Sequence, residues 1–93
     1  MATVEIYTKA SCGFCVRAKR MLDMKKVEYR EIPVDRGGAP REEMLQRAKG
    51  RSTVPQIFID GRHIGGCDDL MALEFDGRLD AMLAVPQQSV GRD

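Results

Sequence analysis

The sequence predicts a single α/β domain in which a four-stranded mixed β-sheet is flanked by three or more helices. Runs rich in β-branched and aromatic residues alternate with amphipathic helical patterns, as expected when helices cover a sheet. An Asp60-Gly61 dipeptide between two apolar runs predicts a β-hairpin, which adds antiparallel strands. The 93 residues are enough for one hydrophobic core and too few for two, so we expect residues 1–93 to form one domain.

The first half of the chain predicts two strands separated by a helix. Residues 3–8 are few, β-branched and aromatic, and predict a buried strand. Residues 13–25 place apolar side chains at helical spacing between basic ones, so an amphipathic helix follows, with Cys12 at its N-terminus. Residues 27–34 contain alternating apolar positions and predict a second strand. A helical crossover of this length makes the second strand parallel to the first.

The middle of the chain predicts a second helix and then the hairpin. Pro40 suits the first turn of a helix that runs to about Lys49, and Gly50 is a typical terminator. Residues 56–60 predict a short strand, and residues 63–66 predict its antiparallel partner.

The last part of the chain predicts further helices and a polar end. Residues 67–69 supply acidic, cap-like side chains before an apolar stretch at residues 70–74, so we expect a helix to begin there. Residues 79–83 predict another short helical turn. Residues 86–93 are mainly polar and are expected to form a flexible tail.

Charge and cysteine usage exclude several classes of function. The 15 Lys and Arg side chains balance 14 Asp and Glu side chains and are interleaved with them, so we expect no nucleic-acid partner and no membrane partner. The first twenty residues contain no apolar segment of a secretion signal, and no apolar run is long enough to span a bilayer. The expected location is the cytoplasm, where a Cys-x-x-Cys pair is more often catalytic or metal-binding than structural.

The most informative motif is Cys12-Gly13-Phe14-Cys15, which follows the first strand and opens the first helix. Two thiols at this spacing form a small disulfide ring, and the thiolate is the attacking species in thiol–disulfide exchange. The helix N-terminus and the Lys9 ammonium favour a thiolate at Cys12, which we predict to be the nucleophile. Cys15 lies one turn further into the helix, so we expect it to be the resolving thiol.

A zinc site is the alternative use of the Cys-x-x-Cys spacing. Cys67 and His63 would have to complete the ligand set, but they lie only four residues apart and no second Cys-x-x-Cys pair accompanies the first. Zinc is therefore the weaker alternative. Cys67 is expected to be a small, packed residue at a helix start, and His63 to be solvated or locally hydrogen-bonded.

Three separated segments have to be considered together: Lys9 with the Cys-Gly-Phe-Cys motif, then Thr53-Val54-Pro55, then Gly65-Gly66-Cys67-Asp68-Asp69. In this order and spacing they resemble the glutaredoxin family, and the resemblance extends from Val4 to about Leu83. Thioredoxins usually carry a Trp directly before the first cysteine, whereas this chain has Ser11 there and contains no Trp. The resemblance implies a thioredoxin-like fold and the use of glutathione as electron donor.

The resemblance also implies how glutathione is held. Val54-Pro55 would be a cis peptide beside Cys12, and the Val54 backbone would pair with the cysteinyl part of glutathione. The backbone N–H groups of Cys67 and Asp68 would receive the γ-glutamyl carboxylate, while the Asp68 side chain would meet the α-ammonium group.

The glycyl carboxylate of glutathione would be met by a cation. Lys9 is the residue implied, with a second cation supplied by Arg41 or Arg51. Phe14 stands where many relatives have Tyr and would keep the apolar wall without the hydroxyl. The glutathione-binding residues implied by the resemblance are Lys9, Phe14, Thr53, Val54, Pro55, Gly66, Cys67 and Asp68.

The predicted function is that of a monomeric dithiol glutaredoxin. Its partners would be glutathione and proteins that are glutathionylated or contain disulfides, attacked by Cys12 and resolved by Cys15. The alternative is a 2Fe–2S cluster carrier, in which Cys12 and glutathione are ligands across a homodimer. Gly13 motivates this alternative because many dithiol relatives have Pro there, and Cys-Gly-Phe also opens the monothiol, cluster-carrying branch of the family.

Overall fold

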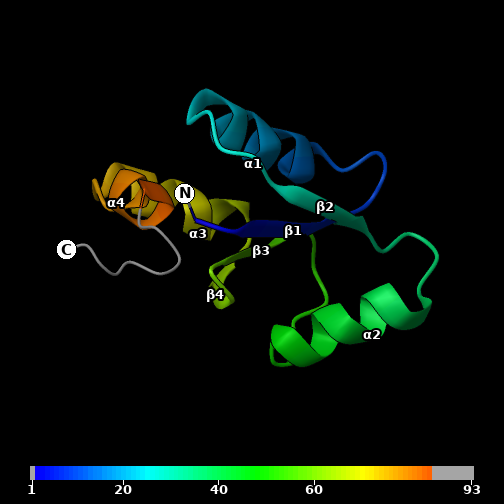
Figure 1. Cartoon of the computed structure of the whole chain (residues 1–93). Helices are drawn as coiled ribbons and strands as arrows, with labels where there is room; N and C mark the ends of the chain where they lie inside the picture. The colour runs from blue at the N-terminus through cyan, green and yellow to red at the C-terminus, as the bar shows by residue number, and fades with distance from the viewer. Residues whose placement is uncertain (1, 85–93) are drawn as a thin grey trace.

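Within residues 2–84, which this computed structural model describes, the sheet contains four strands in the order β2-β1-β3-β4 (Figure 1). The tail predicted at residues 86–93 lies outside the described residues. β1 (Val4–Thr8) pairs in parallel with β2 (Arg30–Pro33) and antiparallel with β3 (Gln56–Ile59). β3 in turn pairs antiparallel with β4 (Arg62–Gly65). The predicted mixed sheet and its parallel first pair are therefore confirmed.

Helices cover both faces of the sheet (Figure 1). α1 (Gly13–Met24), α3 (Cys67–Phe75) and α4 (Leu79–Ala84) pack against one face. α2 (Gly38–Arg47) packs against the other. Because successive side chains of a strand point to opposite faces, β1 contributes to both packing layers.

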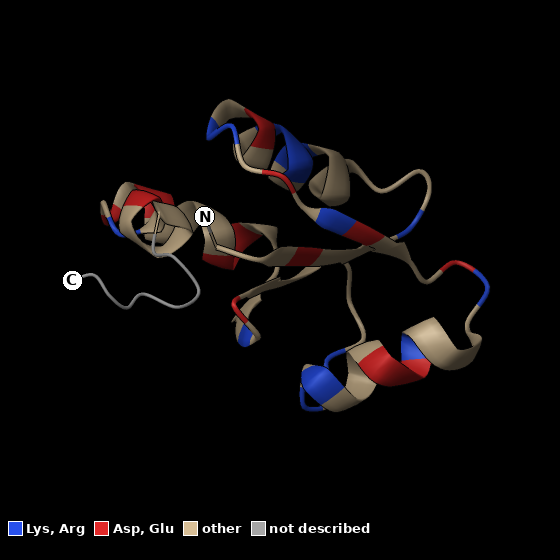
Figure 2. Ribbon diagram, viewed as in Figure 1, with Lys and Arg blue, Asp and Glu red and all other residues tan. Residues whose placement is uncertain are grey.

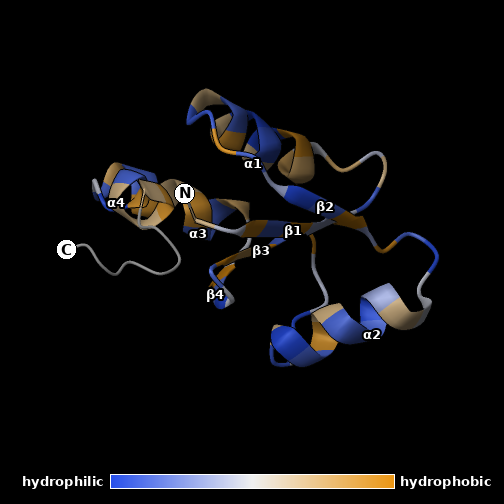
Figure 3. Ribbon diagram, in the orientation of Figure 1, coloured by the Kyte–Doolittle hydropathy of each residue, from blue (hydrophilic) through white to orange (hydrophobic). Residues whose placement is uncertain are grey.

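Each face of the sheet has its own hydrophobic core. The core under α1, α3 and α4 includes the fully buried Ile6, Leu22 and Leu70. The core under α2 includes the fully buried Tyr7 and Met44. Figure 3 shows hydrophobic segments along β1 and β3, between the two helix layers. The sheet thereby fixes the positions of the loops that follow β1 and precede β3.

β2 is shorter than predicted, because the end of α1 uses residues that the alternating pattern assigned to the strand. The prediction was a strand over residues 27–34, whereas β2 spans Arg30–Pro33. Lys26 has a φ of 60°, and the N–H groups of Lys26 and Val27 donate to carbonyls in the last turns of α1. This is a Schellman motif, in which the apolar residue after the left-handed one packs back onto the helix. Val27 is buried in that role and not as part of the strand.

α2 begins two residues before its predicted start and ends with a different residue in the terminating position. Gly38 is its first residue, so Pro40 is the third. Proline is tolerated there because N–H groups of the first turn have no partner within the helix. At the other end Lys49, with a φ of 56°, takes the left-handed position, and Gly50 follows it.

The hairpin between β3 and β4 turns at Asp60-Gly61, as predicted. Both residues have positive φ, 52° and 79°, which matches the type I′ turn typical of two-residue hairpins. Ile59 pairs with Arg62, so Asp60 belongs to the turn and not to the strand predicted over residues 56–60.

Charged side chains of both signs occur on the same helices, as Figure 2 shows for α1 and α2. One cluster fixes the C-terminal end of α1: the Lys25 ammonium lies 2.7 Å from carboxylate oxygens of both Glu74 and Asp80. α1 is thereby tied to α3 and α4 at the end remote from Cys12. None of the helices formed by residues 2–84 is long and apolar enough to cross a membrane.

Candidate active site

The two active-site cysteine candidates lie at the N-terminus of α1. Cys12 is the N-cap residue, with extended dihedral angles of −111° and 105°, and Cys15 is the third residue of the helix. The two are joined as a disulfide, with Cα atoms 5.2 Å apart. Cys12 is half-buried, whereas Cys15 is only 1% exposed. Only Cys12 is therefore accessible to another thiol or disulfide.

The helix N-terminus creates a favourable environment for negative charge at Cys12. The Cys15 backbone N–H donates a hydrogen bond to Cys12 Sγ over 3.1 Å. The first turn of α1 contains no acidic side chain that would oppose this effect. An N–H donor and the helix dipole both stabilise an anion, so they favour a thiolate at Cys12 once the disulfide is reduced.

The loop before β3 lies beside Cys12. The peptide bond between Val54 and Pro55 is cis, as the resemblance implied. The Val54 carbonyl oxygen lies 3.9 Å from Cys12 Sγ. An extended ligand that carries a sulfur atom can therefore pair with the loop backbone and reach Cys12 at the same time.

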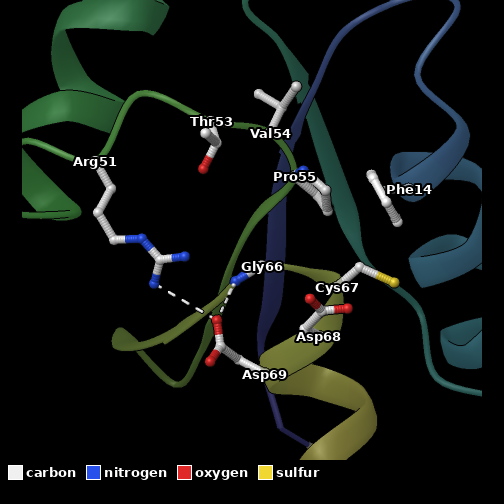
Figure 4. Close-up of a pocket in the computed structure, with 9 residues that line it drawn as sticks. All are labelled: Phe14, Arg51, Thr53, Val54, Pro55, Gly66, Cys67, Asp68 and Asp69. Atoms are coloured by element: carbon white, nitrogen blue, oxygen red, sulfur yellow. Dashed lines mark hydrogen bonds and ion pairs between the residues drawn. The ribbon is translucent and has the colours of Figure 1, made fainter.

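A hollow of about 420 Å³ opens between this loop, the first turn of α1 and the start of α3 (Figure 4). Phe14, which is 55% exposed, forms one wall. Arg51, one of the two candidates for the second cation, and Asp69, to which the resemblance gave no role in binding, complete the lining. The hollow brings together all the predicted glutathione-binding residues except Lys9, namely Phe14, Thr53, Val54, Pro55, Gly66, Cys67 and Asp68.

The start of α3 contains two neighbouring carboxylates with different surroundings. The Asp69 carboxylate accepts a hydrogen bond from the Gly66 N–H over 2.8 Å and lies 3.5 Å from the Arg51 guanidinium (Figure 4). Gly65 has a φ of +119°, and a side chain there would collide with the same carboxylate. Asp68 is exposed, and its side chain makes no hydrogen bond or ion pair with the rest of residues 2–84. Asp69 therefore caps the helix, while Asp68 is available to a ligand.

Cys67 lies beneath the hollow and not on the surface. Its side chain is 4% exposed, and burial raises the pKa of its thiol. Both properties suit the packed residue expected from the sequence, because a protonated, inaccessible thiol is a poor nucleophile. Across residues 2–84, no three His, Cys, Asp or Glu side chains gather in an arrangement suited to a metal ion.

Lys9 is not brought into the lining of the first hollow. It lies at a second hollow, of about 520 Å³, which Cys12 and Cys15 also line. Lys9 is exposed there. The candidate cation in the first hollow is Arg51, whereas Arg41 lines neither hollow.

A polar cluster lies in the second hollow. The Thr8 hydroxyl donates to the Glu31 carboxylate over 2.7 Å, and the Lys19 ammonium lies 2.9 Å from the same oxygen. The hydrogen bond from Thr8 and the charge-assisted bond from Lys19 lower the pKa of Glu31 below its ordinary value. Glu31 is therefore ionised at neutral pH and joins β2 to β1 and α1.

Gln56 and His63 were given no role by the sequence analysis, yet Gln56 contacts Thr53, which lines the first hollow. Gln56 is completely buried at the start of β3, and its side-chain amide contacts both Thr53 and His63. The signal that points to such a contact is an amide side chain between Pro55 and Ile57, at a strand position whose neighbours are apolar. A buried amide must have hydrogen-bond partners.

Comparison with known proteins decides the family. The chain matches the family model described as Glutaredoxin over residues 4–64. It belongs to the glutaredoxin family. It is 59% identical over 83 residues to Glutaredoxin 3 of Escherichia coli strain K12, covering 89% of this chain and 99% of that protein. It is 52% identical over 82 residues to Glutaredoxin 1 of Rickettsia prowazekii strain Madrid E, covering 87% of this chain and 86% of that protein. As a family member it is a thiol–disulfide oxidoreductase, with Cys12 and Cys15 as its cysteine pair.

Solved glutaredoxin structures share the fold. A solution structure of glutaredoxin from Brucella melitensis superposes with a TM-score of 0.77 at 49% identity, covering 89% of each chain. A crystal structure of a buckwheat glutaredoxin–glutathione complex superposes with a TM-score of 0.78 at 38% identity, covering 88% of this chain and 76% of that chain. The expected thioredoxin-like fold is therefore confirmed.

Proposed function

We propose that this glutaredoxin reduces glutathionylated proteins and protein disulfides with glutathione as its electron donor. The observation that carries the proposal is the half-buried Cys12, whose sulfur lies 3.9 Å from the Val54 carbonyl oxygen, next to a hollow that ends at the first turn of α3. A tripeptide with a central thiol and an anionic end suits such a site, because the loop supplies backbone pairing and the helix N-terminus attracts a carboxylate. The buckwheat relative was solved as a glutathione complex.

In this proposal, glutathione lies along the first hollow with its sulfur at Cys12. The Val54 backbone pairs with the cysteinyl residue. The backbone N–H groups of Cys67 and Asp68 hold the γ-glutamyl carboxylate, and the free Asp68 carboxylate meets the ammonium group. The remaining lining residues form the walls of the site, and they are Phe14, Thr53, Pro55 and Gly66.

The glycyl carboxylate would then be met by Arg51, together with Lys9. Arg51 lines the hollow, and its contact with Asp69 joins two side chains that are about half exposed, at 48% and 47%. Ion pairs of that kind contribute less than about 1 kcal/mol, so the guanidinium is readily redirected to a ligand carboxylate. Lys9 is exposed, and its long side chain adds a second positive charge near Cys12.

The proposed reaction consists of two thiol–disulfide exchanges. The Cys12 thiolate attacks the glutathione sulfur of a mixed disulfide, a new S–S bond forms, and the substrate thiolate leaves and takes up a proton. A second glutathione thiolate then attacks the glutathione sulfur on Cys12, which releases oxidised glutathione and regenerates the Cys12 thiolate. With a protein disulfide as substrate, Cys15 attacks the mixed disulfide on Cys12 and leaves the Cys12–Cys15 disulfide for reduction by two glutathione molecules.

Two cysteine variants test the roles of the thiols. Cys12→Ser should abolish reduction of a glutathionylated peptide, because the only accessible thiol of the pair is removed. Cys15→Ser should keep a substantial fraction of the activity, because glutathione replaces the resolving thiol in that reaction. Steady-state turnover with a glutathionylated peptide measures both. Equal loss in the two variants would contradict the mechanism.

The glutathione site is tested separately at Asp68. Asp68→Asn removes the charge proposed to meet the α-ammonium group without enlarging or shrinking the side chain, so the KM for a glutathionylated peptide should rise about tenfold. Asp76→Asn, at the other end of α3, is the matched control and should leave that KM unchanged. An unchanged KM in Asp68→Asn would refute the proposed γ-glutamyl site.

The second candidate function, 2Fe–2S cluster binding, rests on the accessibility of a single thiol. Cys15 and Cys67 are buried, so each chain offers Cys12 alone, and glutathione across a homodimer would have to supply the remaining ligands. Anaerobic reconstitution with iron, sulfide and glutathione, followed by absorption spectroscopy and sedimentation, tests this. A coloured dimer that is lost in Cys12→Ser supports a cluster, and a colourless monomer refutes it.

Both functions need glutathione and reduced thiols, so we propose a cytoplasmic location. Localisation of a tagged full-length chain by cell fractionation tests this proposal.

A further inference from the structure

A chain of hydrogen bonds links β4 to the loop that carries Val54. His63 Nε2 lies 2.6 Å from Gln56 Oε1. The Gln56 side-chain nitrogen in turn lies 2.9 Å from the Thr53 carbonyl oxygen and 3.2 Å from the Thr53 hydroxyl. We propose that His63 and Gln56 are positioning residues that hold Thr53, and with it the Val54 backbone, in the conformation that binds glutathione. This inference rests on the proposed glutathione site.

The orientation of the Gln56 amide follows from its partners. Its side chain is completely buried, and within residues 2–84 every buried side-chain nitrogen and oxygen has a hydrogen-bond partner. A carbonyl oxygen only accepts, so the group facing the Thr53 carbonyl must be the amide NH₂. The Gln56 carbonyl oxygen then faces His63, and the hydrogen between them must come from His63 Nε2. A flipped amide would place two acceptors, the Gln56 and Thr53 carbonyl oxygens, against each other.

The imidazole of His63 is held in place by aromatic packing. It is stacked on Phe58, with ring centroids 5.0 Å apart and ring planes inclined by 27°. Phe58 is itself fixed, because the Arg47 guanidinium lies 4.0 Å above its ring and Tyr7 packs edge-on against it at 5.7 Å. Burial, and then the positive charge of Arg51, lower the pKa of His63, so the ring is neutral at neutral pH. The neutral ring therefore carries its hydrogen on Nε2.

Strand register explains how His63 reaches Gln56. His63 pairs directly with Phe58, and Gln56 lies two residues before Phe58, on the same face of β3. A shift in register between Ile57 and Phe58 interrupts the regular ladder at this point. The side chains of His63 and Gln56 are thus diagonal neighbours across a bulge, where long side chains are within reach.

The consequence for binding lies in Thr53. One amide group restrains both the carbonyl and the hydroxyl of Thr53, which limits rotation about the peptide that leads into Val54. A loop held in its binding conformation loses less conformational entropy when a ligand pairs with it. Loss of the His63 hydrogen bond should therefore weaken glutathione binding more than it alters the chemical step, because Cys12 and its helix are untouched.

The test uses variants that separate the ring from its hydrogen bond. His63→Phe keeps an aromatic ring against Phe58 and removes the donor, whereas His63→Gln keeps a donor at a similar distance from the backbone. Gln56→Met removes both ends of the chain of hydrogen bonds at nearly constant volume, and it is combined with His63→Phe in a double variant. Arg62→Gln, on the adjacent exposed position of β4, is the matched control.

We expect His63→Phe to raise the KM for a glutathionylated peptide about fivefold, the effect of one neutral hydrogen bond, with kcat within about twofold of the unmodified protein. His63→Gln should restore KM, and the double variant should be no worse than Gln56→Met alone, because the two residues act through one path. An unchanged KM in His63→Phe, a parallel fall in kcat, or additive effects in the double variant would overturn the inference.

A second measurement does not depend on glutathione. Nitrogen NMR of the unmodified protein should show His63 as the Nε2–H tautomer, and His63→Phe should shift the backbone amide resonances of Thr53 and Val54. An Nδ1–H tautomer, or unshifted amides, would refute the positioning role directly. If these shifts are seen but the disulfide-reducing activity of the unmodified protein does not depend on glutathione, the proposed function fails and the structural link between His63 and Thr53 stands.

Discussion

Arg47→Met should destabilise the protein strongly, because it removes the central member of a cluster under α2. The Arg47 guanidinium donates to the Glu5 carboxylate and to the Tyr7 hydroxyl, each over 2.8 Å, and lies 4.0 Å above the Phe58 ring. Glu5 is only 17% exposed, and its other ionic partner, Arg30, is 3.7 Å away and 70% exposed. The substitution therefore leaves a largely buried carboxylate without a close partner.

The expected loss can be worked from these contacts. A hydrogen bond to a charged group contributes about 1.5–3 kcal/mol. A guanidinium above an aromatic ring adds about 0.5–2 kcal/mol. Met replaces part of the aliphatic packing of the Arg side chain, so we expect Arg47→Met to lower the free energy of unfolding by about 3 kcal/mol, equivalent to a fall in Tm of about 15 °C.

A double variant separates the unpaired charge from the lost contacts. Glu5→Met combined with Arg47→Met should be less destabilised than Arg47→Met alone, because no buried carboxylate is left unpaired. The chain contains no Trp, so urea unfolding is followed by far-UV circular dichroism. Arg41→Met, which removes an arginine elsewhere on α2, is the control and should change stability by less than about 0.5 kcal/mol. A loss of unfolding free energy below about 1 kcal/mol in Arg47→Met, or a double variant that is less stable than Arg47→Met alone, would refute the reasoning.

Three further substitutions test local features of the fold. Lys26→Gly should raise the free energy of unfolding by about 1 kcal/mol, because Lys26 has a φ of 60°, while Lys26→Ala should bring no gain in the same urea experiment. Gly13→Pro should raise the free energy of unfolding by about 0.4–1 kcal/mol, because Gly13 is the first residue of α1 and no atom lies within 4 Å of an added Cβ. A lower Tm in this variant would contradict the expectation. Glu31 has a lowered pKa, so its carboxylate stabilises the fold above its ordinary pKa of 4.5, and that contribution is lost as the pH falls. Urea midpoints from about pH 3 to pH 7 should therefore depend less on pH in Glu31→Gln, and an unchanged slope would count against this role.

Much of the fold was predictable because local signals agreed with the tertiary structure. The type I′ turn at Asp60-Gly61 is a two-residue choice that few other sequences satisfy, so it identified the hairpin without knowledge of its neighbours. The helix that begins after Cys12 was predictable from apolar spacing alone, and its N-terminus placed the accessible thiol.

The ends of elements were less predictable, because they depend on competition between local structures. Val27 has the apolar, β-branched character of a strand residue, yet it closes the Schellman motif of α1. Lys49 adopts the left-handed conformation although Gly50 follows it directly. At both helix ends a Lys, Lys26 after α1 and Lys49 after α2, takes the left-handed conformation that sequence patterns assign to Gly. The hydrogen bonds at the helix end compensate for the strain.

The contacts across the candidate site were the least predictable part. Arg51 lines the first hollow, whereas Lys9 lines the second, and nothing in the local sequence distinguishes which cation faces which hollow. The link from His63 to Thr53 passes through Gln56 and across a bulge, so it depends on strand register that sequence alone does not specify.

The burial of Cys15 also determines the regiochemistry of reduction. At 1% exposure its sulfur is shielded, so an incoming thiolate reaches only the Cys12 end of the disulfide. The S–S bond then breaks with its electron pair on Cys15, and the incoming group becomes attached to Cys12. Of the two mixed disulfides that a symmetrical bond would permit, only one forms. Reductant and substrate therefore share one point of covalent attachment, and an adduct trapped in either direction of electron flow should map to Cys12.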